Sequence, residues 1–393
     1  MYPTLYDLVK DLTGWGFAPF KIIQSFGLFV ALAFLGAAYT LSMELRRKEK
    51  EGKLHPTTQK IMVGVPPKPI DYILSALIGF IVGYKLLDLI LNFSVAAQNP
   101  QNFILSWHGN LLGGIAAATL SVYFKYKETM AEKRDQPELV SITIAPHEQV
   151  GTITIIAAIA GIIGAKIFHN LENLDDFYAD PVGSLTSFSG LTFYGGLIVA
   201  AVCVLYYAAK NNIPGLHLCD ATAPGLMLAY GIGRIGCQVA GDGDWGIPND
   251  APKPEWLHFL PDWMWAYNYP NNVLHMNLIN DYASMGLVSK TGYAWPTPIY
   301  ETIMCLLLFA FLWAIRKRLK IPGIMFCIYL IVNGIERFCI EKIRINTVYH
   351  IFGHKITQAE IISTCCVIAG IAGIFYLRKS AKSASQSFST SNL

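Results

Sequence analysis

Charged residues are scarce in this sequence. Of its 393 residues only 15% are Asp, Glu, Lys or Arg, whereas 53% are hydrophobic, and the mean hydropathy is +0.40. An average soluble domain has about 25% charged residues. A soluble chain of this length would therefore have too few charged residues to cover its surface. The shortage excludes an ordinary soluble protein and indicates an integral membrane protein. The net charge of +3 is also too small to favour nucleic-acid binding.

The cysteines of this sequence do not follow a pattern typical of disulfides or zinc sites. All eight cysteines lie in or at the edge of apolar stretches, between Cys203 and Cys366. Their spacing is not that of a zinc site, and their positions argue against a disulfide scaffold. We therefore expect no disulfide framework, no metal ion and no cofactor.

Long apolar stretches are abundant. A helix that spans a bilayer needs about 20 mostly apolar residues, and nine stretches of the sequence meet this need. They are rich in Gly and Ala, as expected where helices pack closely in lipid. We expect an all-α, polytopic integral membrane protein with about nine transmembrane helices, at roughly 22–44, 70–92, 103–124, 149–169, 190–210, 217–238, 297–315, 322–341 and 358–377.

The basic residues orient these helices. Lys and Arg follow the first, third, fifth, seventh and ninth stretches, whereas the loop at 170–189 is acidic. The positive-inside rule then places the N-terminus outside and the C-terminus in the cytoplasm. On this topology the long segment 240–296 faces outward. Because it holds five of the eight Trp, we expect a folded aromatic cap on the outer leaflet, with an ordered loop that binds nothing as the alternative.

Two parts of the chain resemble each other. Residues 77–86 parallel 158–167, with Gly83-x-Lys85 matching Gly164-x-Lys166. Further on, 107–111 (Trp-His-Gly-Asn-Leu) parallels 193–197 (Phe-Tyr-Gly-Gly-Leu). The second and third predicted helices therefore look like a degenerate copy of the fourth and fifth. Chance similarity between Gly-rich apolar helices is the alternative.

Several ionisable residues lie within the apolar stretches. A charge at the bilayer centre costs about 2.5–3.5 kcal/mol on insertion scales, so each one is a candidate functional residue. Arg337 and Glu341 are four residues apart and can pair directly, whereas Asp220 is better explained as a structural partner or helix-start acid than as a catalyst. The candidates are Lys85, His108, Lys166, Asp220, Arg234, Glu301, Glu336, Arg337 and Glu341.

The densest polar and glycine-rich segment is 231–246. Within it, Arg234 has a planar guanidinium group that suits a pair of phosphate oxygens. Asp242 and Asp244 could pair with Arg234 or hold a cationic group. A purely structural Arg–Asp pair at a helix exit is the alternative.

These motifs resemble the prolipoprotein diacylglyceryl transferase family, bacterial inner-membrane enzymes that begin lipoprotein maturation. The run Gly233-Arg234-x-Gly236, Gly241-Asp242 and Trp245-Gly246 is similar to the family signature. The segments 193–197, 296–301 (Pro-Thr-Pro-Ile-Tyr-Glu) and Arg337-x-x-x-Glu341-x-x-Arg344 resemble three further family motifs in the same order. The first and the fourth to ninth predicted helices match the family, so the second and third are extra.

The sequence departs from the family pattern at six positions. Tyr194 stands where the family usually has His, and Asp242 replaces Glu. The other departures are Cys237 and Ala240 for Asn, Trp295 for His and Phe26 for Tyr. These departures put an unchanged catalytic mechanism, rather than the fold, in question.

The resemblance implies a domain organisation of six segments. These are 1–45, the first transmembrane helix with an N-terminal arm; 46–148, inserted cytoplasmic loops and two extra transmembrane helices; 149–240, a transmembrane core with the signature motif; 241–296, the extracytoplasmic cap; 297–379, the C-terminal transmembrane core; and 380–393, a disordered tail.

The resemblance also implies an activity: transfer of the diacylglyceryl group from phosphatidylglycerol to the lipobox cysteine of a prolipoprotein signal peptide, in the bacterial inner membrane. The implied partners are phosphatidylglycerol, that signal peptide and membrane lipid, with no nucleic acid. Catalytic candidates are Arg234, Arg337, Tyr194 and His108. Candidates for substrate binding are Arg344, Glu341, Glu301, Tyr300, Asp242, Gly195, Gly196, Gly236, Gly246 and Phe26.

The acceptor thiol, with a pKa of about 8.5, must become a thiolate. Three possibilities stay open: the field of the arginines alone, Tyr194 as a base, or His108 as a base. Two other functions also remain: a non-catalytic or transport-type membrane protein on the same scaffold, in which Lys85, Lys166 and His108 line a polar path, and a related lipid transferase with another donor or acceptor.

Overall fold

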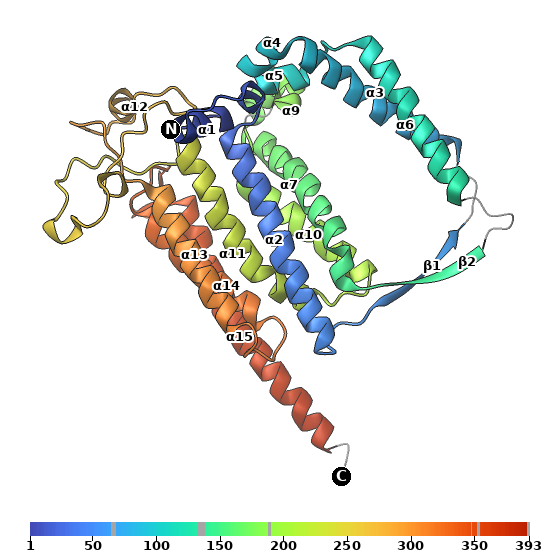
Figure 1. Ribbon diagram of the computed structural model, residues 1–393. Coiled ribbons are helices and arrows are strands. Elements are labelled where there is room, and N and C mark those ends of the chain that lie inside the picture. Colours follow the sequence, from blue (N-terminus) through green and yellow to red (C-terminus); the bar gives the residue numbers. More distant parts are fainter. Residues whose placement is uncertain (64–67, 133–137, 188–189, 347, 352–353, 391–393) are drawn as a thin grey trace. The chain divides into compact units, whose positions relative to one another are not determined.

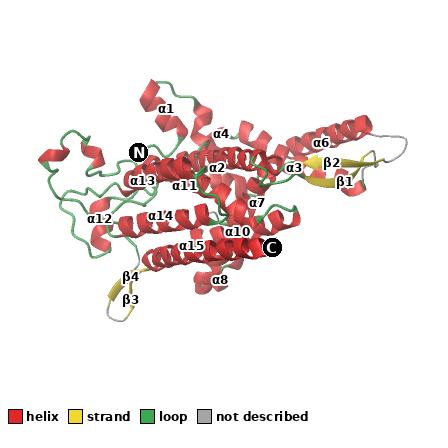
Figure 2. Cartoon of the chain, turned by 90° about the horizontal axis from the view of Figure 1, so that it is seen from below, coloured by secondary structure: helices red, strands yellow, loops and turns green. Residues whose placement is uncertain are grey.

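The computed structural model describes residues 1–63, 68–132, 138–187, 190–346, 348–351 and 354–390 (Figures 1 and 2). These residues form two compact units, which we describe separately. The first comprises Met1–His55, Pro146–Thr154 and Leu205–Leu393, and the second Pro56–Ala145 and Ile155–Val204.

The described chain is mostly helical, and a long helix overlaps each predicted apolar stretch. The helix predicted at 103–124 is shifted, because Pro100–Leu105 forms a short helix of its own and the long helix runs over Leu111–Glu132. Six helical segments are long and apolar enough to cross a membrane: Ser25–Lys50, Pro69–Leu91, Pro146–Glu172, Phe193–Lys210, Thr297–Ile315 and Gln358–Ser383. The chain is therefore a multi-pass membrane protein, while nine crossings and their orientation stay predictions. The long helices are α2 (Ser25–Lys50), α3 (Pro69–Leu91), α6 (Leu111–Glu132), α7 (Val150–Glu172), α10 (Phe193–Lys210), α11 (Gly215–Ala240), α13 (Thr297–Ile315), α14 (Ile324–Glu341) and α15 (Gln358–Thr390).

Two details differ from the expectations of an all-α fold and a disordered tail. Short antiparallel ribbons form outside the apolar stretches: β1 (Thr57–Val63) pairs with β2 (Glu138–Ile144), and β3 (Val348–Ile351) with β4 (His354–Thr357). Helix α15 continues to Thr390, into the segment 380–393 for which we expected a disordered tail, because no proline or glycine interrupts it there. Residues 391–393 lie outside the described part.

The first unit is built around α11. This helix packs against α2, α13 and α14, and α14 packs in turn against α15 (Figure 1). Asp220, near the start of α11, accepts hydrogen bonds from the backbone N–H groups of Gly323 (2.8 Å) and Phe326 (3.0 Å). These donors lie at the start of α14 and have no partner within that helix. Asp220 therefore has the structural role that we favoured for it.

Residues 241–296, the cap, follow α11. They hold the 3₁₀ turns η3 (Glu255–Leu257) and η4 (Asp262–Met264) and the helix α12 (Leu278–Ser284). The cap has a small aromatic core in which the tilted rings of Trp245 and Tyr269 lie 5.0 Å apart and Tyr282 is fully buried. Tyr282 donates to the backbone oxygen of Gly246 at 2.9 Å, which ties this core to the loop that follows α11.

The second unit contains a structural repeat. Each copy runs from a long helix through two short ones to a second long helix: α3, α4 (Phe93–Gln98), α5 (Pro100–Leu105) and α6, then α7, α8 (Leu174–Ala179), α9 (Pro181–Thr186) and α10. Lys85 donates to the Ser106 hydroxyl at 3.1 Å, and Lys166, 81 positions later, to the Ser187 hydroxyl at 2.9 Å. A repeated fold, rather than chance similarity, accounts for the sequence parallel.

The structure corrects the register of this repeat. The backbone N–H of Asn110 donates to Tyr84, and that of Thr192 donates to Ala165. Residues 110–114 therefore correspond to 192–196, which pairs Tyr194 with Leu112. The parallel that we drew between 107–111 and 193–197 is wrong. Glycine is needed where two helices cross, so the positions of the crossings decide which glycines of the two copies correspond. His108 precedes α6 and lies in the loop after α5, where its side chain is exposed.

Close crossing of α7 and α10 depends on glycine at position 164. A Cβ atom there would lie 2.6 Å from the Cβ of Val199 and 2.7 Å from the backbone oxygen of Gly195, whereas one at Gly161 would meet its nearest atom at 3.9 Å. We predict that Gly164→Ala lowers the free energy of unfolding by about 1–3 kcal/mol. Gly161→Ala, in the same helix, is the control and should be neutral or stabilising. Thermal unfolding in detergent measures both, and equal shifts would contradict the crossing.

Candidate functional site

A cluster of charges surrounds Glu301, near the start of α13. The Glu301 side chain is completely buried, and its carboxylate contacts three arginines and a tyrosine. Its partners are Arg234 Nε (3.1 Å), Arg337 Nη1 (3.3 Å), Arg344 Nη1 (3.2 Å) and the Tyr230 hydroxyl (2.8 Å). One carboxylate thus gathers three guanidinium groups that come from α11, from α14 and from the segment after α14. We call these arginines and Glu301 the arginine cluster.

Two further carboxylates complete the charge balance. Asp244 bridges two arginines: one oxygen pairs with Arg234, and the other lies 2.5 Å from Nη2 of Arg344. Glu341 pairs with Arg337 at 2.9 Å, which confirms the pair expected from their four-residue spacing. Three guanidinium groups therefore face three carboxylates, and each arginine has at least two charged partners.

The backbone of the cap places Arg344. Gly246 forms a bridge with Arg344, and the N–H of Ile247 donates to the oxygen of Ile343 at 2.9 Å. A Cβ atom at Gly246 would collide with the Ile343 backbone and lie 2.8 Å from the Trp295 Cβ. Only glycine permits this approach. Gly246, which the sequence predicted as a site residue, therefore has a structural role: it positions Arg344.

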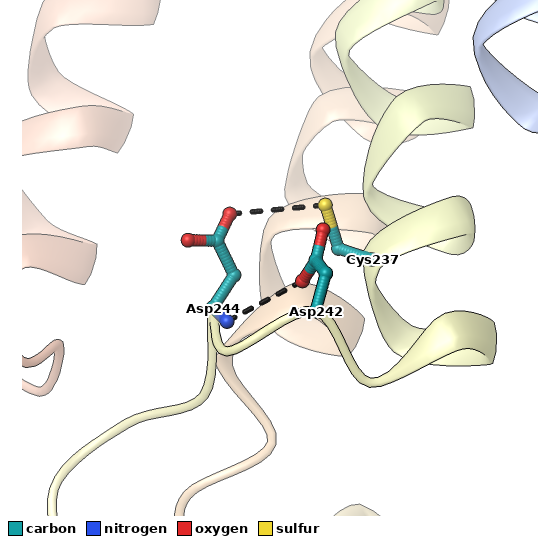
Figure 3. Close-up of side chains that lie close together, drawn as sticks. All are labelled: Cys237, Asp242 and Asp244. Carbon is teal, nitrogen blue, oxygen red and sulfur yellow. Dashed lines mark hydrogen bonds between the residues drawn. The ribbon is translucent and has the colours of Figure 1, made fainter. Parts of the chain in front are cut away.

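Cys237, Asp242 and Asp244 lie together at the exit of α11 (Figure 3). One ligand atom from each lies within 4.8 Å of the others, a spacing that a metal ion could use. Asp244, however, is already bonded to Arg234 and Arg344, and two permanent positive charges beside the group repel a cation. The two arginines therefore weigh against a metal ion at this position.

The two aspartates differ in their acidity. Burial raises the pKa of the Asp242 carboxyl, and the neighbouring charge of Asp244 raises it further. Burial acts in the same direction on Asp244, but the positive charges of Arg234 and Arg344 outweigh it and lower the pKa of this carboxyl below its ordinary value. Asp244 is therefore held as a carboxylate by its arginine partners.

Glu336, next to Arg337 on α14, is 4% exposed. Neither of its carboxyl oxygens has a hydrogen-bond partner among the described residues. An ionised carboxylate buried without partners is costly, so this environment suits an uncharged carboxyl group. Glu336 then leaves the charge balance of the arginine cluster unchanged.

Three other predicted residues of the first unit lie beside the cluster without bonding to it. The Tyr300 hydroxyl donates to the backbone oxygen of Met264 (2.7 Å) and lines a cavity of about 270 Å³ in the cap, with Trp265 and Trp295 among its other walls. Gly236 allows α11 to approach α2, because a Cβ atom there would meet Phe29 at 2.8 Å and Phe26 at 3.5 Å. Gly236 and Phe26 are thus neighbours at a helix crossing.

The remaining predicted residues belong to the second unit. Gly195 and Gly196 contact α7, where a Cβ atom would meet the backbone oxygens of Gly164 and Gly161. Tyr194 is partly exposed, and its ring meets Phe193 edge-on. His108 contributes its backbone oxygen to Lys85. The geometry of the arginine cluster therefore does not test Tyr194 or His108, and both stay predictions.

Two members of the site were missing from the predicted set. Tyr230 stands one helical turn before Arg234, and its ring lies 5.2 Å from that guanidinium carbon. This i, i+4 spacing is the signal that could have identified it. Asp244 was considered as a partner of Arg234 or as the holder of a cationic group, and not as a partner of Arg344. Its contact with Arg344, 100 residues away, has no local signal in the sequence.

Comparison with known proteins agrees with this geometry. The profile of the family described as prolipoprotein diacylglyceryl transferase matches residues 129–376, more than half of the chain and including every residue of the arginine cluster. The chain belongs to this family. Helices α2 and α3 lie before the matched segment.

Individual relatives bear the name phosphatidylglycerol–prolipoprotein diacylglyceryl transferase. The protein from Dehalococcoides mccartyi is 24% identical over 297 residues, which cover 75% of this chain and 97% of the relative. That from Streptococcus agalactiae is 24% identical over 282 residues, covering 70% and 93%. That from Corynebacterium efficiens is 30% identical over 236 residues, covering 59% and 68%.

The lowered pKa of Asp244 predicts a pH dependence of stability. A carboxyl group whose pKa is lower in the folded state stabilises the fold above its unfolded pKa, which is about 3.9, and loses this contribution as pH falls through the folded value. The wild type should therefore be more stable than Asp244→Asn at neutral pH, by an amount that is constant down to about pH 5 and shrinks below about pH 4. Thermal unfolding across this range measures the difference, and a difference that grows on acidification would contradict the ion pairs.

Proposed function

We propose that this protein transfers the diacylglyceryl group of phosphatidylglycerol to the cysteine thiol of a prolipoprotein signal peptide, in the bacterial inner membrane. The new bond is a thioether, and the released product is glycerol phosphate. The observation that carries the proposal is the convergence of Arg234, Arg337 and Arg344 on the buried Glu301, in a chain of this family.

The arginine cluster suits the leaving group. As the carbon–oxygen bond breaks, negative charge grows on the departing phosphate, and fixed cations in a water-poor site stabilise such charge strongly. Guanidinium groups can each hold two phosphate oxygens. Because Glu301 already fixes all three, little reorganisation is needed when the lipid binds.

The thiolate has three possible origins. Our first choice is the field of the arginines, which would favour ionisation of a thiol placed near them. Tyr194 is the second candidate and His108 the third. The exposed loop position of His108 gives this residue no special environment for proton transfer.

A transport function is the main alternative, and one observation weighs against it. The ammonium group of Lys85 donates to the backbone oxygens of Phe103 (2.9 Å), Ser106 (2.5 Å) and His108 (2.6 Å). It thereby fastens the loop between α5 and α6, and Lys166 makes the equivalent contact with Ser187. These lysines act as anchors of the repeat rather than as the walls of a polar path. A related transferase with another donor or acceptor would share the cluster and differ in its substrates.

An in vitro assay with phosphatidylglycerol and a lipobox peptide tests the proposal. We expect turnover by the wild type and a loss of about 10²–10³-fold in Arg234→Ala, because one donor to the developing charge is removed. Arg316→Ala is the control: Arg316 is also ion-paired, with Glu44 at 2.6 Å, but lies outside the cluster. Its activity per folded molecule should stay normal. Wild-type turnover that survives Arg234→Ala would contradict the role of the cluster.

The same assay separates the origins of the thiolate. If the arginine field suffices, Tyr194→Phe and His108→Ala keep nearly normal rates. A large loss in one of them alone would identify the base. Failure of the wild type both in this assay and in complementation of a transferase-depleted bacterium would contradict the enzyme function.

A further inference from the structure

The charge balance of the arginine cluster poses a problem for an anionic substrate. Its three guanidinium groups are already neutralised by Asp244, Glu301 and Glu341. Adding the phosphate of a lipid without removing a carboxylate would leave an unbalanced negative charge in a largely buried site, which is costly. One carboxylate therefore has to give up its arginines when the phosphate enters.

Only Asp244 can do so at low cost. The carboxylates of Glu301 and Glu341 are fully buried on helices, so either would lose its partners with no water to replace them. The Asp244 side chain is 34% exposed and belongs to the loop that leaves α11. It can exchange its arginine partners for water.

The backbone beside Asp244 is fixed, so the arginines are released by a movement of the side chain alone. Gly243, immediately before Asp244, has a φ of 95°, a conformation that suits glycine. The backbone oxygen of Asp244 is held by the Thr297 hydroxyl at 2.7 Å, which anchors the chain at this point. Rotation of the side chain about its own bonds is then enough to release the arginines, and the loop can stay in place.

The contacts that Asp244 makes with the two arginines resemble those that a phosphate group would make. Each carboxylate oxygen of Asp244 faces a different arginine, Arg234 on one side and Arg344 on the other. The two free oxygens of a phosphodiester can make the same pair of contacts, with the same single negative charge.

We propose that the Asp244 carboxylate occupies the phosphate position between Arg234 and Arg344 in the free protein and is displaced when phosphatidylglycerol binds. This inference rests on the proposed function. Asp244 acts as a placeholder: it keeps two arginines apart and in position, and it sets the affinity for the lipid by competing with its phosphate.

The test is equilibrium binding of short-chain phosphatidylglycerol to the purified full-length protein. Asp244→Asn keeps the shape of the side chain and removes its charge. We expect it to bind the lipid about tenfold more tightly, while its unfolding temperature without lipid falls because two ion pairs are lost. Opposite changes in affinity and stability are the signature of a placeholder, since a purely structural residue would lower both.

Asp250→Asn is the matched control. Asp250 is also a cap-loop aspartate and accepts hydrogen bonds from Lys290 and Thr291, but it bonds to no arginine in the described structure. Its lipid affinity should equal that of the wild type. If Asp244→Asn does not fold, Asp244→Ser removes the same charge and replaces it in the test.

The outcomes are distinct. Wild-type binding with equal or weaker binding by a folded Asp244 variant overturns the placeholder while leaving the proposed function intact. An absence of phosphatidylglycerol binding and turnover in the wild type and in all variants overturns the proposed function and the placeholder together. Tighter binding by the Asp250 control as well would assign the effect to the general charge of the cap and overturn the placeholder.

Discussion

A single buried carboxylate, that of Glu301, is the contact on which the rest of the site depends. Arg234, Arg337 and Arg344 come from separate parts of the chain, and three guanidinium groups this close would repel each other without a shared anion. Burial of Glu301 strengthens its attraction for all three. The packing of α11, α13 and α14 brings these groups together, so the bundle and the site are held by the same contacts.

The charges around Glu301 also explain how the protein can keep three arginines buried among its helices. Each positive charge has a carboxylate partner, and Glu336, which is buried without a hydrogen-bond partner in the described part of the chain, fits an uncharged group. The resting cluster is neutral, which suits a low-dielectric interior. A neutral cluster with one partly exposed carboxylate, that of Asp244, can bind an anion strongly without any additional positive charge.

Local sequence patterns placed most of the helices within a few residues, since an apolar run and the glycines or prolines around it mark where a helix lies. The third predicted helix, 103–124, was placed about eight residues too early, because the short helix α5 takes up the start of that apolar run. The pair of Arg337 and Glu341 could be foreseen for the same reason, because both lie on one helix face. The convergence of three arginines on Glu301 could not, since packing alone brings them to Glu301 from positions 36, 43 and 67 residues away in the sequence. The register of the repeat was also missed, because helix crossings, and not motif similarity, decide which glycines correspond.

The central claim is that the arginine cluster binds the phosphate of the donor lipid. An experimental structure of the protein with bound phosphatidylglycerol tests it most directly. The account predicts the phosphate between Arg234 and Arg344, with Glu301 still bonded to the three arginines. A headgroup bound elsewhere, with no arginine of the cluster in contact with the phosphate, would contradict it.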